Sequence, residues 1–215
     1  MKTIHSQYIK DGYYITPDPV LPPDVVQRAA GGMDAIRAGT YDTGVPPLDS
    51  PWNPGDDENK LCKIEMPQIA SRGVYELVSH PALGKLAAEV TGAEMVQVWW
   101  VQLLYKPASR PGATVQTNVG WHQDRQYWST WEEGSELFTA WVAVSNVTED
   151  AGPMRFVRGS HNWGLLNQGN FFDQDHDAQR REIQPPNGAD WKETAALLPP
   201  GGVSFHEKLT FHASG

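Results

Sequence analysis

The spacing of apolar residues changes near residue 94, and this change constrains the fold more than any other feature of the chain. Over 81–92, apolar residues recur every three or four positions, between a proline and a glycine suited to begin and end a helix. Over 138–144, two apolar faces alternate with the period of a β-strand. The order of the two patterns predicts helices first and an antiparallel β-domain afterwards.

The same criteria predict the remaining elements. We expect helices at 24–30, 68–77 and 81–91, and strands at 96–105, 138–144, 154–157 and 203–206. The strand over 96–105 is apolar on both faces, as a central strand would be. The pair Gly31-Gly32 weakens the first helix, and 41–60, 106–119 and most of 164–198 are expected to be irregular.

Composition limits the class of protein. A length of 215 residues fits one domain, and 17 Lys+Arg against 26 Asp+Glu give a net charge of −9, which argues against nucleic-acid and anionic-membrane partners. Cys62 is the single cysteine, so no internal disulfide or CxxC site is possible. No signal peptide or long apolar span is evident, and a cytoplasmic protein is therefore expected, with its oligomeric state open.

The segment Gly120-Trp121-His122-Gln123-Asp124 carries the clearest chemistry. Side chains two apart on a strand share a face, so His122 and Asp124 point to one spot while Gln123 points away. An imidazole and a carboxylate placed in this way can bind a divalent cation, and one distant histidine would complete the two-His-one-carboxylate triad typical of non-haem Fe(II) oxygenases. The alternative is a surface His and Asp on an ordinary strand.

Two later segments accompany this motif. Residues 149–161 read as an acidic turn, a tight Gly-Pro, a short strand and a Gly-Ser turn that ends at His161, a pattern that also fits a simple hairpin. Residues 199–215 place a strand and a turn ahead of His212.

In that order the three segments resemble the phytanoyl-CoA dioxygenase family of Fe(II)- and 2-oxoglutarate-dependent oxygenases. The likeness extends to Tyr8–Ile15, similar to the family's opening strand and following helix, and to Gln102–Pro107. It implies a mainly β fold with flanking helices, a double-stranded β-helix (a cupin-like jelly roll) preceded by N-terminal helices. We expect a single oxygenase domain over 1–215, mostly helical over 1–94, with the jelly-roll core over 95–215.

The resemblance also implies the site residues. The iron ligands would be His122, Asp124 and His212, because the family's last ligand stands in a His-x-Ser-Gly run, here His212-Ala213-Ser214-Gly215. His206 is the competitor, at a position where the family tolerates a non-ligand histidine. The implied contacts to 2-oxoglutarate are Gln102, Trp141, Ser214 and Lys63. Core packing for Trp141 and a solvated role for Lys63 are the alternatives.

One expected element does not occur in the sequence. The family binds the distal carboxylate of 2-oxoglutarate with an arginine shortly after the last histidine, because such a carboxylate needs a bidentate partner. No arginine follows His212 before Gly215. We therefore expect the β-core to be incomplete at this end, with the arginine beyond Gly215 or absent.

The implied activity is hydroxylation of a small organic molecule by dioxygen, with release of succinate and CO2 and with ascorbate as a candidate reductant. The presence of Asp124 favours hydroxylation over the halogenation catalysed by relatives that lack this carboxylate. The negative net charge disfavours a coenzyme A thioester as substrate. A pocket could draw on nearby aromatic residues, and Arg125 could meet an anionic substrate. Trp99, Trp100, Trp121, Tyr127, Trp128, Trp131, Phe171 and Phe172 are these aromatic candidates.

Two other functions fit the same residues. One is a non-catalytic jelly roll that binds a ligand or a partner. The other is a cupin-type metalloenzyme of different chemistry, such as a zinc- or manganese-dependent isomerase or hydrolase.

Overall fold

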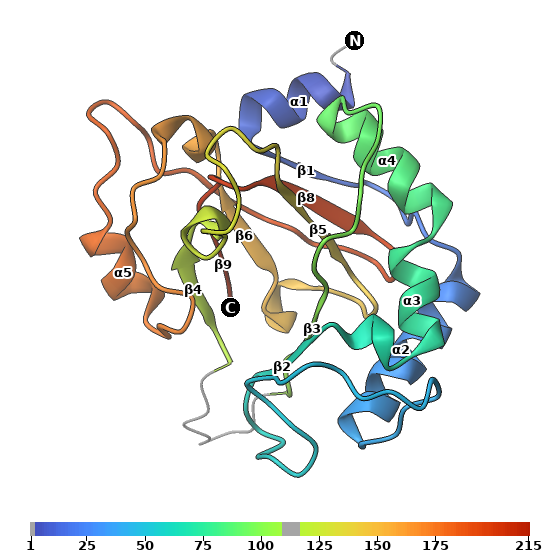
Figure 1. The fold of residues 1–215 in the computed structure, drawn as a ribbon. Coiled ribbons are helices and arrows are strands. Elements are labelled where there is room, and N and C mark those ends of the chain that lie inside the picture. Colours follow the sequence, from blue (N-terminus) through green and yellow to red (C-terminus); the bar gives the residue numbers. More distant parts are fainter. Residues whose placement is uncertain (1–2, 109–116) are drawn as a thin grey trace.

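The computed structural model describes residues 3–108 and 117–215, and its centre is formed by antiparallel strands in three sheets (Figure 1). One sheet has the order β1-β8-β5, a second has the order β4-β9-β6-β7, and β2 pairs with β3. The strands are β1 (Tyr13–Ile15), β2 (Cys62–Glu65), β3 (Gln102–Tyr105), β4 (Val119–His122), β5 (Phe138–Val142), β6 (Met154–Val157), β7 (Glu193–Ala195), β8 (Val203–Glu207) and β9 (His212–Ser214).

Helices flank these sheets, as the sequence predicts. They are α1 (Ile4–Asp11), α2 (Pro23–Arg37), α3 (Arg72–Val78), α4 (Pro81–Thr91) and α5 (His176–Glu182). Short 3₁₀ turns occur at Pro67–Ile69, Asp124–Gln126, Glu149–Ala151 and Ser160–Trp163. In Figure 1, α1 and α4 run beside the β1-β8-β5 sheet, and α5 lies beside β4. Within the described ranges no helix is both long enough and apolar enough to cross a membrane.

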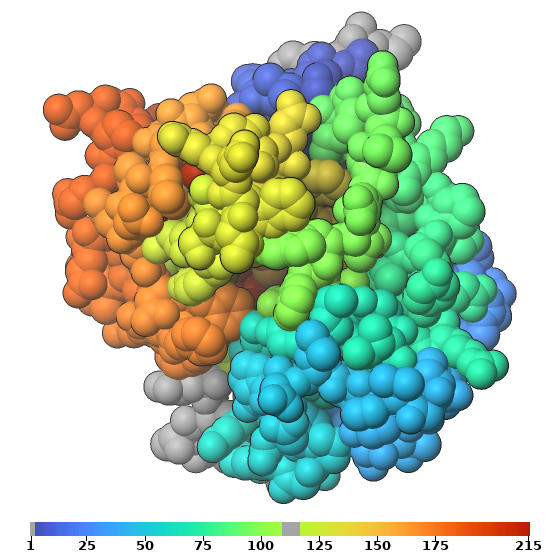
Figure 2. Space-filling view, viewed as in Figure 1, coloured from blue at the N-terminus to red at the C-terminus, as the bar shows by residue number. Residues whose placement is uncertain are grey.

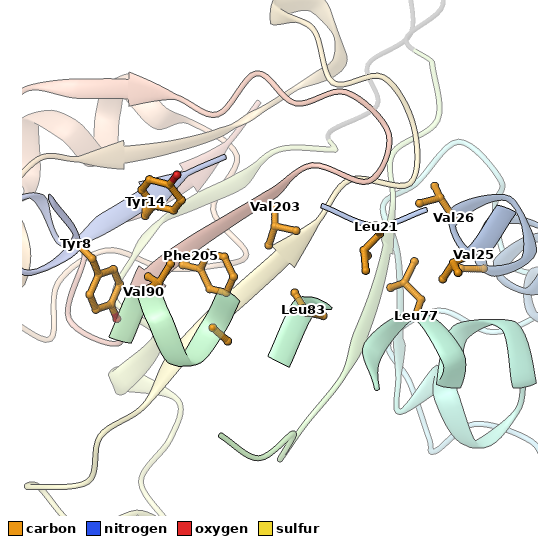
Figure 3. Packing of buried hydrophobic residues seen from close by; sticks show 12 residues of the cluster. Tyr8, Tyr14, Leu21, Val25, Val26, Leu77, Leu83, Val90, Val203 and Phe205 are labelled. Atoms are coloured by element: carbon orange, nitrogen blue, oxygen red, sulfur yellow. The ribbon is translucent and has the colours of Figure 1, made fainter. Parts of the chain in front are cut away.

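The two faces of β8 have different surroundings. One face packs against the helices, and the other faces the interior between the sheets. Val203 and Phe205 are fully buried and pack with α2 and α4, including Val25 and Leu83 (Figure 3). Because successive side chains of a strand point to opposite faces, Ser204 and His206 face the other way. Packing against the helices therefore orients the polar face of β8 towards the interior of the molecule.

The strand prediction for 96–105 is largely wrong. Only Gln102–Tyr105 forms a strand, and its single partner among the described residues is β2. Trp99 and Trp100 are 40% and 44% exposed, and Trp99 makes edge contacts with Trp128 and Trp131. Trp99, one of the residues that suggest a central strand, instead packs beside the turn that contains Trp128 and Trp131.

Two helix predictions need correction, and a third needs none. The helix predicted from residue 24, weakened by Gly31-Gly32, is α2 and continues through these glycines to Arg37. At Gly32 a Cβ would fall 2.1 Å from Ser71 Oγ, so the missing side chain lets the start of α3 approach α2. The helix predicted over 68–77 is broken, since Ser71 caps a new helix that begins at Arg72. Residues 8–15 hold the end of a helix followed by a strand, the reverse of the expected order.

Other predictions are confirmed. The helix from Pro81 to Thr91 ends at Gly92 in the left-handed conformation. Along β5, Phe138 and Ala140 pack towards the helices, whereas Trp141 packs on the opposite side. The predicted loop at 106–119 is not among these, because residues 109–116 lie outside the described residues. The segment 164–198 is mostly irregular, but it also contains α5 and β7.

Candidate metal centre

Two histidines from neighbouring strands lie side by side in the interior. His122 ends β4, His212 begins β9, and the two residues are direct cross-strand partners. Their ring centroids are 4.1 Å apart, and both side chains are almost completely buried. The cross-strand pairing thus brings together two imidazoles that are far apart in the sequence.

The third group, Asp124, follows the end of β4. Gln123 keeps the extended conformation, so Asp124 projects to the same side as His122. Gln123 points away, as predicted, and its amide donates hydrogen bonds to the carbonyl oxygens of Gly164 and Leu209 at 2.8 and 2.7 Å. These buried hydrogen bonds fix the backbone between the histidine and the carboxylate.

One ligand atom each of His122, Asp124 and His212 lies within 4.8 Å of the others. Asp124 Oδ1 is 3.7 Å from His122 Nε2 and 3.5 Å from His212 Nε2. Each Nδ1 donates to a backbone carbonyl, His122 to Gly120 at 2.7 Å and His212 to Thr210 at 2.9 Å. The proton is thereby fixed on Nδ1 and the Nε2 lone pair is free, as in metal-binding histidines.

The electrostatics favour the ligand forms of these groups. Burial tends to raise the pKa of Asp124, but the adjacent His212, His122 and His206 outweigh this effect and hold the pKa well below its usual range. Burial, together with the neighbouring imidazoles, lowers the pKa of His212 well below its usual value. A carboxylate and a neutral imidazole are the protonation states that bind a divalent cation.

His206 contacts the carboxylate without joining the group of three. It lies on β8, and its Nε2 is 3.0 Å from Asp124 Oδ2, the oxygen that also accepts a hydrogen bond from Thr139 Oγ1 at 2.6 Å. The competing histidine therefore faces the second carboxylate oxygen. Thr139 is a residue that the sequence patterns did not reveal.

Two aromatic side chains pack against the ring of His122. The rings of Tyr127 and Phe171 lie 5.7 and 5.2 Å from the ring of His122, and the Tyr127 hydroxyl accepts a hydrogen bond from the Phe171 backbone. Figure 2 shows a hollow near the middle of the viewed face, with dark red atoms of the C-terminal part at its floor. Two of the predicted pocket residues thus contact a proposed metal ligand directly.

Two further residues predicted near a ligand have other roles. Trp121 is 2% exposed and packs with Trp163, Trp191 and Phe211, on the side of β4 opposite to His122. The Arg125 guanidinium donates hydrogen bonds to the carbonyl oxygens of Trp128 and Trp131. It holds a turn, and neither an anionic group nor an ion pair uses it within the described part of the chain.

The four residues predicted to bind 2-oxoglutarate do not lie together in the structure. Lys63 and Gln102 meet at the carboxylate of Glu65, which pairs with Lys63 and accepts from Gln102 Nε2 at 3.2 Å. Trp100 Nε1 donates to the same carboxylate at 2.6 Å. The charge of Lys63 is therefore already balanced by a neighbouring carboxylate.

Trp141 and Ser214 lie elsewhere. Trp141 is partly buried against the cluster of hydrophobic residues between the two larger sheets. Ser214 lies on β9, two positions beyond His212 and therefore on the same face, and its Oγ accepts a hydrogen bond from Lys106 Nζ at 2.7 Å. Burial lowers the pKa of the Lys106 ammonium to about 8. Lys106 has no acidic partner within the described residues. It belongs to the segment Gln102–Pro107 that resembles the family, but the sequence assigned it no role.

A separate cavity of about 360 Å³ lies between α2 and α3, lined by residues that include Arg28, Ser71 and Glu76. None of the metal-centre residues lines it, and the chemistry described above favours the interior site instead.

Known proteins show where this architecture occurs. The structure of the epimerase SnoN with Fe3+, alpha ketoglutarate and nogalamycin RO shares 22% identity, covers 99% of this chain and 75% of its own, and has a TM-score of 0.69. The carbocyclase SnoK from nogalamycin biosynthesis shares 22%, covers 97% and 74%, and has a TM-score of 0.70. AviO1 from Streptomyces viridochromogenes Tue57 shares 19%, covers 99% and 86%, and has a TM-score of 0.65.

At these identities the structures establish the fold alone, and they confirm the expected jelly-roll class. No curated protein matches the sequence. The family model described as phytanoyl-CoA dioxygenase (PhyH), in contrast, matches residues 8–215 and includes every residue of the metal centre. The chain belongs to the phytanoyl-CoA dioxygenase family.

Proposed function

We propose that this protein is an Fe(II)- and 2-oxoglutarate-dependent dioxygenase that hydroxylates a small organic molecule. The convergence of His122 Nε2, Asp124 Oδ1 and His212 Nε2 carries the proposal. Two neutral imidazoles and one carboxylate are the donor set of non-haem Fe(II) oxygenases, which leave positions for co-substrate and dioxygen. Nitrogen and oxygen donors without a thiolate fit Fe(II) better than a closed structural zinc site.

When bound, Fe(II) and 2-oxoglutarate supply the oxidising chemistry. Dioxygen is reduced, 2-oxoglutarate becomes succinate and CO2, and one oxygen atom enters a C–H bond of the substrate. The chain's own residues hold the ligand atoms in place and limit access of water. Tyr127 and Phe171 would form part of the wall that excludes water beside His122.

We assign the distal carboxylate of 2-oxoglutarate to Ser214 and Lys106. Ser214 is two residues from His212 along β9, a step of roughly 6.5 Å in a strand. A short dicarboxylate anchored at the metal by its keto-acid end can span that step. The serine hydroxyl and the lysine ammonium would then both donate to its far carboxylate. Trp141, Gln102 and Lys63 remain candidates for further contacts.

The substrate proposed is a free small molecule rather than a coenzyme A thioester. Tyr127 and Phe171, which pack on the ring of His122, would offer an apolar surface to the substrate. Lys63 pairs with Glu65, and Lys106 is assigned above to 2-oxoglutarate, so neither lysine is free for a further anionic group. A ligand with several phosphates finds little positive charge in these surroundings.

Anaerobic addition of Fe(II) and 2-oxoglutarate tests the proposal. The purified protein should develop a weak visible charge-transfer band, and addition of dioxygen with a substrate panel should release succinate. D124A should show neither band nor succinate while it keeps the far-UV circular dichroism of the parent. Absence of the band in the parent protein, with no succinate, would refute the oxygenase proposal and leave a ligand-binding jelly roll or another metal chemistry.

Product composition then separates hydroxylation from related reactions. The structural neighbours include an epimerase and a carbocyclase, so the shared fold accommodates more than one outcome. Hydroxylation adds one oxygen atom to the substrate, epimerisation leaves its formula unchanged, and oxidative ring closure removes two hydrogen atoms. High-resolution mass spectrometry of the product identifies which reaction occurs.

A further inference from the structure

The two oxygens of Asp124 have different surroundings. Oδ1 faces the Nε2 atoms of His122 and His212 at 3.7 and 3.5 Å. Oδ2 accepts hydrogen bonds from Thr139 Oγ1 at 2.6 Å and from His206 Nε2 at 3.0 Å. One oxygen is thus free for a metal, and the other is held by donors.

The donors and the ligands come from opposite sheets. Thr139 and His206 are direct cross-strand partners on β5 and β8, just as His122 and His212 are on β4 and β9. The carboxylate of Asp124 lies between these two pairs and joins the β1-β8-β5 sheet to the β4-β9 sheet. Two regular strand pairings therefore set the position of the carboxylate from both sides.

The tautomer of His206 follows from its partners. A carboxylate oxygen only accepts, so Nε2 of His206 carries the hydrogen that it donates. Nδ1 of His206 is buried and has no hydrogen-bond partner within the described residues, so a proton there would be an unsatisfied donor. With its Nε2 hydrogen directed at Asp124, His206 cannot offer that nitrogen to a metal.

We propose that Thr139 and His206 are positioning residues that bind Oδ2 of Asp124 and leave Oδ1 as the single metal-binding oxygen of this carboxylate. This inference rests on the metal centre proposed above. Without the two donors the carboxylate could rotate and use both oxygens, which would occupy a coordination position needed for co-substrate or dioxygen. Partners of this kind typically alter metal affinity by about 10- to 100-fold.

The test uses Co(II) as the probe and requires no turnover. T139V replaces the hydroxyl with a methyl of similar size, and T139S is its matched control because it keeps the donor. We expect T139V to bind Co(II) about 10- to 100-fold more weakly than the parent, with an altered visible d–d spectrum, and T139S to resemble the parent. H206L should behave like T139V, and H206Q should recover much of the affinity through its amide N–H.

Each outcome decides between explanations. Parent-like affinity and spectrum in T139V would overturn the proposal, and so would equal losses in T139S and T139V, since these would indicate packing alone. If H206L fails to fold, the Thr139 pair still decides. If the parent protein itself binds no Co(II), the metal centre fails, and the positioning role fails with it. Metal binding by the parent together with unchanged T139V removes only the positioning role.

Discussion

His122 and His212 lie directly opposite each other on β4 and β9, with their ring centroids 4.1 Å apart. In both residues Nδ1 is hydrogen-bonded to a backbone carbonyl, so both Nε2 atoms turn towards Asp124. His206 lies equally close to His212, with a centroid distance of 4.1 Å, yet it contacts the other carboxylate oxygen. The structure therefore gives different partners to His206 and His212, which lie only six positions apart in the sequence.

The first prediction compares these two histidines. H212Q removes a proposed ligand and should abolish detectable Fe(II) or Co(II) binding, because an amide is a much weaker ligand than imidazole. H206Q retains a donor towards Asp124 and should bind within about 10-fold of the parent. Isothermal titration with Co(II) measures both. The reverse order of affinities would make His206 the ligand.

The second prediction concerns Lys106 and pH. Burial lowers the pKa of its ammonium to about 8, so the positive charge proposed to bind 2-oxoglutarate is lost as the pH rises above that value. The dissociation constant for 2-oxoglutarate should therefore increase from pH 7 towards pH 9. K106M should weaken binding by about 10- to 100-fold at pH 7, because a hydrogen bond to a charged group contributes about 1.5–3 kcal/mol.

K106R is the control for that prediction. Arginine keeps its charge throughout this range, so the pH dependence of co-substrate binding should flatten.

The stability of the protein without co-substrate should change with pH in the opposite direction to its affinity for 2-oxoglutarate. Between pH 8 and the usual lysine value of 10.5 the unfolded chain binds more protons, so the free energy of unfolding contributed by Lys106 rises with pH. Parent-like 2-oxoglutarate affinity in K106M would remove Lys106 from the site.

The sequence predicts an element correctly where its local pattern fits only one kind of secondary structure. The α4 helix has an apolar stripe and clear end signals, and β5 has strict alternation, and both occur as expected. The segment over 96–101 has strand-like composition, but composition does not reveal whether a neighbouring strand is available. There Trp99 packs against Trp128 and Trp131 instead.

In the candidate site, too, the sequence predicts what depends on local backbone geometry and misses what depends on packing between strands. The spacing of His122 and Asp124 places two ligands on one side because this depends only on local backbone geometry. Local spacing does not predict the roles of Thr139 and Lys106. Their partners, Asp124 and Ser214, lie on or beside other strands, so these contacts depend on how the strands pack together. The resemblance to a family supplied His212, and strand pairing explains why that histidine reaches the others.

The third prediction concerns Arg125, which holds the turn beside the metal strand. Its guanidinium donates to the carbonyl oxygens of Trp128 and Trp131. R125M should lower the free energy of unfolding by about 1–3 kcal/mol, because partly buried carbonyl groups lose charged donors. R155M is the matched control, since the ion pairs of Arg155 are 3.7 Å long and partly exposed, and it should change stability by less than about 1 kcal/mol. Urea denaturation of both variants checks the difference, and equal effects would contradict it.

The fourth prediction concerns the contact between α2 and α3, where two glycines lie in different surroundings. At Gly73, a Cβ would stand 2.5 Å from the backbone oxygen of Arg28, a contact that the backbone cannot relieve without moving a helix. At Gly31, nothing lies within 4 Å of the same position. G73A should therefore cost about 1–3 kcal/mol through overpacking. G31A should stabilise the protein by about 0.5–1 kcal/mol, because alanine favours the helix interior. Thermal denaturation measures both variants, and a stabilising G73A would show that α2 and α3 are not held at this separation.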